Sequence, residues 1–394
     1  MAMNETAAVR VVKDRSITLR SSGPSSILRH ARIREATFAD YQPVTALQAR
    51  NGLSTKSRLD WCELWASNPA YLKSSDELPI GWVLERGDGA VVGFLGNLPL
   101  SYRFRGRDLL AATANSWVVE DGYRGYAIRL LDVFLKQESV DLFVFTTVNP
   151  SSEVVLRALR INKVPVGRWD TARFWITGYR GFARSALAAR SIPLPDLCAA
   201  PVAGALWVRD LVDGQVGGIS PEVEIRVRAE FDKDFEQFWK TSEQQNPDRL
   251  WAVRDPETLA WHYRAAIARG TLWVVTATVG ADIVAYWVVD RQDHKDLGLK
   301  RLRFVDFQAL AGYQHLLQTA VSWMLQKCRE EEIHVADNLG SWLEHYNIPG
   351  TVGPYCRKMK SWLFYYRARR GELAQQLQDP GVWAPSSYDG DASL

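Results

Sequence analysis

An internal duplication is the sequence feature that most constrains the fold of this chain. Each of two long segments contains a Gly-Tyr pair, a helical stretch, a strand and an Asn, spaced almost equally, at 122–149 in the first segment and 312–338 in the second. An aromatic strand then follows in both segments, at 174–176 and 362–364. Three anchors in the same order and register predict two copies of one structural unit.

Breaker clusters and changes in composition suggest where these copies begin and end. Residues 1–31, rich in Ser, Arg and Gly, are predicted to form a mobile arm before the first copy at 32–180. A stretch rich in Pro and Gly at 181–222 is predicted to be a partly ordered linker. The second copy is predicted at 223–372, with a C-terminal tail at 373–394.

Within each copy, the pattern reads as a strand, one or two helices, a run of strands, a helix and a further strand. A strand–helix–strand crossover within such a run predicts a mixed sheet with one parallel pair. The fold class is therefore α/β (α+β): two tandem domains, each a mostly antiparallel sheet with a central parallel pair flanked by helices. In the first copy, the helix predicted at 128–137 places Ile128, Leu131 and Leu135 on one face.

Composition narrows the class of protein. The 394 residues are 47% hydrophobic and 24% charged, as in soluble globular proteins, and the net charge is only +3. A nucleic-acid partner is therefore not favoured.

The longest apolar run, 197–208, is interrupted by Pro201 and Gly204, so no membrane span is predicted. No secretory signal is evident, which predicts a cytoplasmic protein. The spacing of Cys and His predicts no metal site, and the oligomeric state is left open.

The motif that points to chemistry lies where an apolar strand meets a helix. The strand ends at Trp117–Glu120, and a turn containing Arg124 and Gly125 leads into a helix near Ala127. The first N–H groups of a helix lack intrahelical acceptors and carry the positive end of the helix dipole. This turn is therefore a candidate cradle for an anion.

This motif resembles the pyrophosphate-binding loop of the GNAT superfamily of N-acetyltransferases, whose usual form is Tyr-Arg-Gly-x-Gly-x-Gly/Ala between a strand and a helix. Ala127 stands where the family usually has Gly, and Arg129 stands where a second small residue is usual. The resemblance implies acetyl-CoA or another acyl-CoA as co-substrate, with its pantetheine arm between two splayed parallel strands. The implied cofactor-binding residues are Val118, Val119, Arg124, Gly125, Tyr126, Ala127, Arg129 and Asn149.

In the chemistry of that family, an amine attacks the thioester directly, which requires a proton acceptor and an acid for the thiolate. Glu120 is the candidate acceptor, although a solvated acid at a strand end has the same appearance. Leu156 occupies the position where the family often has a catalytic Tyr, so Tyr126, Tyr123 or water would have to supply the acid. The second copy has Gln314 in place of Arg124, followed by no small residue, which predicts that it binds no CoA.

Two other function classes remain open beside an acyltransferase acting on a small-molecule amine. A degenerate pair of domains could be a non-catalytic scaffold or a ligand sensor. The tandem arrangement also resembles the Fem-type aminoacyl transferases, which would need a basic groove for tRNA. The aromatic content suggests an amino sugar or a sugar-linked intermediate as acceptor. Trp61, Trp65 and Trp261 are the candidate substrate-binding residues, with core packing as the alternative.

Overall fold

The computed structural model describes residues 30–74, 78–212 and 220–394, so nearly all of the predicted N-terminal arm lies outside the described residues. The chain forms two compact units. Of the described residues, the smaller unit comprises those from His30 to Leu100 together with Leu110–Val144, and the larger unit comprises Ser101–Leu109 together with those from Phe145 to Leu394. This division does not follow the predicted linker at 181–222.

The smaller unit is a sheet in which the strands follow the order β1-β2-β3-β4-β5. β1 with β2 and β2 with β3 are antiparallel pairs, and β4 with β5 is a parallel pair. The end of β3, the start of β4 and the second half of β5 belong to the larger unit. The elements are β1 (Ala31–Glu35), η1 (Phe38–Asp40), α1 (Tyr41–Arg50), α2 (Arg58–Ala66), α3 (Pro69–Leu72), β2 (Gly81–Arg86), β3 (Val91–Phe104), β4 (Arg107–Val119), η2 (Asp121–Tyr126), α4 (Ala127–Leu135) and β5 (Leu142–Val148).

The buried face of α4 differs from the predicted one. Leu130, Leu131 and Phe134 are buried, whereas the side chain of Ile128 is 51% exposed. The buried residues are spaced i, i+1 and i+4, as on one face of an α-helix. The prediction chose the neighbouring stripe of apolar residues, because α4 is apolar on more than one side, and therefore assigned Ile128 to the wrong face.

The larger unit contains a second sheet, with the strand order β8-β10-β11-β12-β13-β7-β14. β12 and β13 are its parallel pair, and the other neighbouring strands are antiparallel. The elements are α5 (Pro150–Ala158), β6 (Asn162–Lys163), β7 (Thr171–Ile176), α6 (Tyr179–Ala188), α7 (Pro195–Val212), β8 (Glu224–Arg228), α8 (Lys233–Gln245), β9 (Trp251–Ala252), α9 (Pro256–Ala268), β10 (Leu272–Val279), β11 (Asp282–Arg291), η3 (Lys295–Leu297), β12 (Arg301–Ala309), η4 (Gln314–Leu316), α10 (Leu317–Glu330), β13 (Val335–Leu339), η5 (Trp342–Tyr346), β14 (Tyr355–Lys358), β15 (Leu363–Ala368), α11 (Gly371–Gln376) and η6 (Pro380–Val382).

The two sheets share one strand order, but each takes one strand from the other half of the chain. The first sheet continues from β5 to β15 and then β6, and the second continues from β13 to β7 and then β14. β7 and β15 are the aromatic strands that the sequence assigned to the first and second copy, respectively. The tandem arrangement of two mixed sheets, each with a central parallel pair, is confirmed, and the sixth strands are exchanged.

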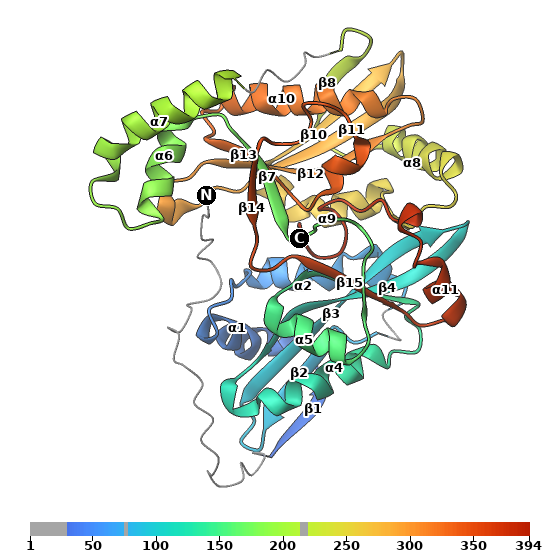
Figure 1. Cartoon of the computed structure of the whole chain (residues 1–394). Helices are drawn as coiled ribbons and strands as arrows, with labels where there is room; N and C mark the ends of the chain where they lie inside the picture. Colours follow the sequence, from blue (N-terminus) through green and yellow to red (C-terminus); the bar gives the residue numbers. More distant parts are fainter. Residues whose placement is uncertain (1–29, 75–77, 213–219) are drawn as a thin grey trace. The chain divides into compact units, whose positions relative to one another are not determined.

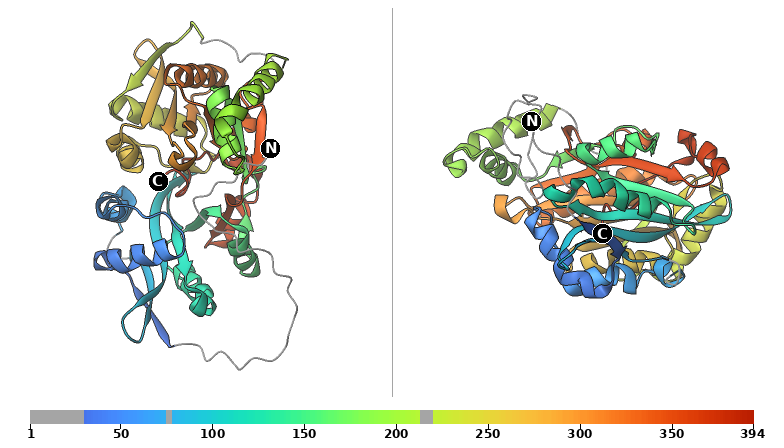
Figure 2. Two further views of the ribbon diagram at one scale, coloured as in Figure 1. Left: turned by 90° about the vertical axis from the view of Figure 1, so that its left-hand side faces the viewer. Right: turned by 90° about the horizontal axis from the view of Figure 1, so that it is seen from below.

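Helices occupy much of the stretch predicted as a linker. α6 and α7 lie side by side (Figures 1 and 2) and pack through small and apolar side chains, including Ala183, Leu187 and Ala199. α6 also covers β7 and β13, where Phe182 joins a buried cluster with Phe174. α10 packs on β12 and β13, as expected of the helix that connects a parallel pair (Figure 1).

Candidate functional site

The central parallel pair of the first sheet has a short ladder. Only Ala111–Thr113 pair with Leu142–Val144, although β4 continues to Val119 and β5 to Val148. Ser116 of β4 lies beyond this ladder and has a φ of 57°, which is left-handed backbone and rare for a non-glycine residue. Such irregularities redirect backbone groups and are frequent beside functional sites. The predicted CoA loop begins immediately after this strand.

The loop itself is two turns of 3₁₀ helix, η2, followed directly by α4. The N–H of Tyr123 donates to the carbonyl of Glu120 at 2.8 Å, and the N–H of Ala127 donates to the carbonyl of Arg124. These bonds use donors that an anion cradle would offer to a phosphate. A bound pyrophosphate would therefore have to replace part of the 3₁₀ bonding.

The charged side chains of the loop are already engaged. Arg124 is largely exposed and donates to Asp121 Oδ1 at 2.7 Å. The guanidinium of Arg129 lies 5.1 Å from the centre of the Tyr126 ring, a cation–π contact. Asp132, the protein carboxylate that could have paired with Arg129, instead accepts from Lys136 at 2.7 Å. Arg129 therefore packs against the loop.

The two candidate catalytic residues, Glu120 and Tyr126, lie at the two ends of η2. Glu120 follows β4 and accepts a hydrogen bond from Arg50 at 2.8 Å, so its carboxylate forms an ion pair with α1. The ring of Tyr126 is buried beneath Arg129. Val118 is also buried, while Val119 is half-buried.

Asn149 and Leu156 both belong to the segment that follows β5. The Asn149 side chain caps α5 by accepting from the N–H of Ser152 at 2.9 Å. Leu156 lies on the same helix and is buried. The family's catalytic Tyr position is thus a core position in this chain.

The corresponding loop of the second copy is closed by its own side chains. Gln314 Oε1 accepts from the N–H of Gly312 at 3.0 Å, and His315 Nδ1 lies 3.0 Å from the Gly312 carbonyl. Leu316 and Leu317 follow and are fully buried. That the second copy binds no CoA stays a prediction.

The three candidate substrate-binding tryptophans are all interior residues. Trp61 is 3% exposed and Trp65 is 0% exposed in α2, where their rings lie 5.1 Å apart. The indole N–H of Trp65 donates to the carbonyl of Asn97 at 2.6 Å. Trp261, in α9 of the other unit, is 4% exposed. Such burial is typical of core packing, so a role in acceptor binding stays a prediction.

The C-terminal segment approaches the end of β5. Asp391 accepts from the Thr146 hydroxyl at 2.8 Å, and a Cβ on Gly390 would lie 2.4 Å from a Thr146 methyl. Residues 386–389 are buried, whereas the sequence predicted a tail from residue 373. Asp391 is a carboxylate beside the strand that leads to Asn149, and sequence reasoning missed it. The aromatic residues Trp383 and Tyr388 in the predicted tail were the available signal.

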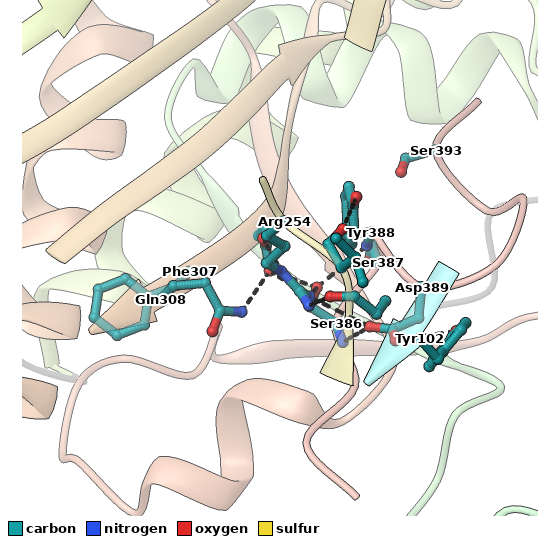
Figure 3. A network of polar contacts seen from close by, with 12 residues as sticks. Tyr102, Arg254, Phe307, Gln308, Ser386, Ser387, Tyr388, Asp389 and Ser393 are labelled. Atoms are coloured by element: carbon teal, nitrogen blue, oxygen red, sulfur yellow. Dashed lines mark hydrogen bonds and ion pairs between the residues drawn. The ribbon is translucent and has the colours of Figure 1, made fainter. Parts of the chain in front are cut away.

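A buried charge network holds this segment in place (Figure 3). Arg254 donates to both oxygens of Asp306, at 2.9 and 3.3 Å, and lies 3.5 Å from Asp389. Burial opposes ionisation of Asp306, but the charge and hydrogen bonds of Arg254 hold its pKa below the usual range. Burial raises the pKa of Asp389, and Arg254 only partly offsets this effect. Ser386 donates to Asp306 at 2.6 Å, which ties the segment to β12.

Across residues 30–74, 78–212 and 220–394, no His, Cys, Asp or Glu side chains form a group of three or more arranged to hold a metal ion. No helix in the same part of the chain combines the length and apolarity needed to cross a membrane.

No protein-family model matches the chain, and no curated protein matches its sequence. Solved structures do match. A GCN5-related N-acetyltransferase from Anabaena variabilis has a TM-score of 0.52 at 14% identity, covering 86% of this chain and 73% of its own. The N-myristoyltransferase of Saccharomyces cerevisiae, solved with bound myristoyl-CoA, has a TM-score of 0.51 at 10% identity, covering 91% of this chain and 82% of its own.

A probable N-acyltransferase from Enterococcus faecalis is similar to the same degree, with a TM-score of 0.53 at 11% identity, covering 86% of this chain and 73% of its own. Identities this low are evidence for the fold alone. One conclusion about the fold follows from the strand order, the short parallel ladder and these three likenesses. The chain has the fold of the GCN5-related N-acetyltransferases, built as two tandem sheets.

Proposed function

We propose that this protein transfers an acyl group, with acetyl the simplest case, from acyl-CoA to the amine of a small molecule. The observation that carries the proposal is the end of β4. There, a short parallel ladder, a left-handed residue at Ser116 and a loop with Arg124, Gly125 and Ala127 follow one another along the chain. Solved structures named as an N-acetyltransferase and a probable N-acyltransferase share the fold, which supports the proposal.

Each loop residue has a distinct part in this proposal. Exposed Arg124 would exchange Asp121 for a phosphate oxygen, because guanidinium groups bind both anions through charge-assisted hydrogen bonds. Gly125 and Ala127 would let the pyrophosphate approach the backbone. The backbone of Val118 and Val119 would bind the pantetheine amides, with Asn149 at the end of the next strand. Acyl-CoA would supply the activated acyl carbon.

Proton transfer has two candidates beside the loop. The Glu120 carboxylate, whose Oε1 accepts from Arg50, would take the amine proton, and Tyr126 would donate to the departing thiolate. The acceptor class rests on aromatic content alone, with an amino sugar or sugar-linked amine as the specific hypothesis.

Replacing Arg124 with Glu tests the loop assignment. We expect Arg124→Glu to weaken acetyl-CoA binding by about 1–3 kcal/mol, the range for a lost charge-assisted hydrogen bond. Isothermal titration calorimetry with acetyl-CoA measures the change. Lys136→Glu is the matched control, because Lys136 is also an exposed cation in an ion pair, at the other end of α4. Equal affinity of the Arg124 variant and the native chain would remove the loop from the proposal.

A non-catalytic scaffold is the second candidate function, because the 3₁₀ bonds of η2 and the Arg129–Tyr126 contact close the loop. Arg129→Gly restores the family's small residue and removes that contact. If the native loop binds CoA through Arg129, we expect the variant to bind acetyl-CoA more weakly, again by about 1–3 kcal/mol. Calorimetric binding seen only in the variant would instead favour the scaffold. Fem-type aminoacyl transfer gains no support from a net charge of +3.

A further inference from the structure

A pocket of about 450 Å³ lies at the C-terminal end of α5, beside the paired strands β6 and β15. Its volume is within the range of pockets that hold small molecules. All of its lining residues belong to the larger unit. Tyr365 and Ile161 line it as buried side chains, whereas Arg157, Arg160 and Lys163 line it as exposed ones. The pocket is therefore open to solvent and bordered by cations.

These three cations have no carboxylate partner. In the part of the chain that the structure describes, no Asp or Glu forms an ion pair with any of them. Arg157 lies one helical turn after Glu153, a spacing at which a Glu and an Arg on a helix can pair. The Glu153 carboxylate instead accepts a hydrogen bond from the Tyr365 hydroxyl at 2.6 Å. Because one carboxylate and three cations line the pocket, it has two positive charges in excess.

The end of α5 is capped by backbone groups and not by these side chains. Cations near a helix C-terminus often donate to the last carbonyl groups of the helix. In α5, the carbonyls of Val155, Leu156 and Arg157 already accept from backbone N–H groups at 3.0–3.1 Å. The helix end therefore does not use the side-chain donors of the pocket, which remain available to a ligand.

Arg160 stands where the backbone favours glycine. Its φ is 54°, which is left-handed, and the N–H of Ile161 donates to the carbonyl of Leu156 at 3.0 Å. This bond pattern ends many helices, and the left-handed residue within it is usually Gly, because a side chain there is strained. Strained residues of this kind are concentrated at binding sites. The strain at Arg160 places a guanidinium at the pocket.

We infer that this pocket binds the phosphate monoester of a small molecule other than acyl-CoA. A phosphate monoester carries a charge of about −1.5 to −2 at neutral pH and three strong acceptor oxygens. This charge matches the two excess positive charges, and guanidinium groups bind phosphate through paired N–H···O bonds. A single carboxylate would neutralise only one of them. Asn149, the proposed contact for CoA, lies about 12 Å from Arg157 along α5.

Isothermal titration calorimetry of the full chain with glucose 6-phosphate tests the site, because this probe has a phosphate monoester but no amine to acylate. We expect one bound molecule per chain. Glucuronate, a sugar of similar size with one negative charge, should bind more weakly by about tenfold or more. Glucose should show no measurable binding. Similar affinity for all three compounds, or binding of none, would overturn the inference.

Arg160→Gly separates ligand binding from a structural role. The variant should bind glucose 6-phosphate about 10–100-fold more weakly, as expected for one lost charge-assisted hydrogen bond. Its midpoint of thermal unfolding should equal or exceed the native value, because Gly suits a left-handed φ. Arg105→Gly is the matched control and should bind the probe normally. Arg105 is also an exposed arginine with a left-handed φ, of 51°, but it pairs with Asp248 outside the pocket.

Lys163→Gln tests the pocket from the side of β6 and should also weaken binding of glucose 6-phosphate by about 10–100-fold. Lys163 is exposed and has no ion-pair partner among the described residues, so the variant should keep native stability. Native affinity for the probe in both Arg160→Gly and Lys163→Gln would overturn the assignment of the pocket.

Titrations with acetyl-CoA separate this inference from the proposed function, since CoA also carries a phosphate monoester. We expect saturating acetyl-CoA to leave the binding of glucose 6-phosphate unchanged. Displacement of the probe by acetyl-CoA, with Arg160→Gly weakening both ligands, would assign the pocket to CoA and overturn the inference. Probe binding that depends on Arg160, in a chain that binds no acetyl-CoA, would support the inference and contradict the proposed function.

Discussion

Arg254→Met is expected to lower the free energy of unfolding by about 3–5 kcal/mol, the range for removing one partner of a buried ion pair. Arg254 is 3% exposed and its partner Asp306 is 0% exposed, so water cannot replace the lost guanidinium. The substitution also leaves Asp389 without its nearby cation. Urea denaturation of the intact chain, followed by tryptophan fluorescence, measures the change.

The effect of Arg254→Met should depend on pH. In the native chain, Arg254 holds the pKa of Asp306 below its unfolded value, so this stabilisation is complete at neutral pH and is lost as the pH falls through the folded pKa. In the variant, burial still raises the pKa of Asp306, while the hydrogen bonds from Ser386 and Gln308 still lower it, and the lowering by Arg254 is lost. The Asp306 carboxylate of the variant should therefore take up a proton at a higher pH than in the native chain, so the stability difference between variant and native chain should shrink as the pH falls below neutral.

Arg105→Met is the control for this experiment, because Arg105 pairs with Asp248 at 2.9 Å but both side chains are largely exposed. Its cost should stay within about 1 kcal/mol at every pH, as for other surface pairs. A cost of the same size in both variants would contradict the special role of the buried network.

Trp65→Ala is expected to lower the free energy of unfolding by about 3–5 kcal/mol, the usual cost of truncating a buried Trp to Ala. The variant loses the contact with Trp61 and leaves the Asn97 carbonyl without its indole donor. Trp207→Ala is the control, because that side chain is 52% exposed on α7. It should change stability by about 0.5 kcal/mol or less.

The same experiment decides between core packing and acceptor binding for Trp65. If Trp65 lined an acceptor site, its replacement by Ala would weaken acceptor binding, and the variant would keep nearly native stability. Stability within about 1 kcal/mol of the native value in Trp65→Ala would therefore contradict the core assignment.

The sequence was sufficient to predict the duplicated strand order, because spacing and hydrophobic periodicity record which residues form strands and helices. It could not predict that β7 and β15 exchange sheets. Both strands have the same aromatic character, and periodicity does not specify a strand's partner. The strand, the turn and the helix around residues 117–135 were predicted, but the 3₁₀ form of the turn and the exposure of Ile128 in α4 were not.

The C-terminal segment shows a different limit of sequence reasoning. Ser, Asp and Gly near residues 386–391 have the composition of a solvated tail, and they are buried because their polar atoms have partners far away in the sequence. Asp306 and Thr146 are such partners. Contacts between distant residues depend on tertiary structure, so the hydrogen bond between His262 and Ser393 could not be recognised from spacing.

The exchanged strands also have a consequence for how the chain folds during synthesis. β5 ends at Val148, but its neighbour β15 begins only at Leu363. While the ribosome makes the intervening residues, the backbone N–H and C=O groups on one edge of β5 have no strand to pair with. Such an unpaired edge can pair with another chain, which leads to aggregation. The first half cannot be completed before the last part of the chain emerges, so its folding depends on closing one very long loop. Cutting the gene between the copies would therefore leave two incomplete sheets rather than two independent domains.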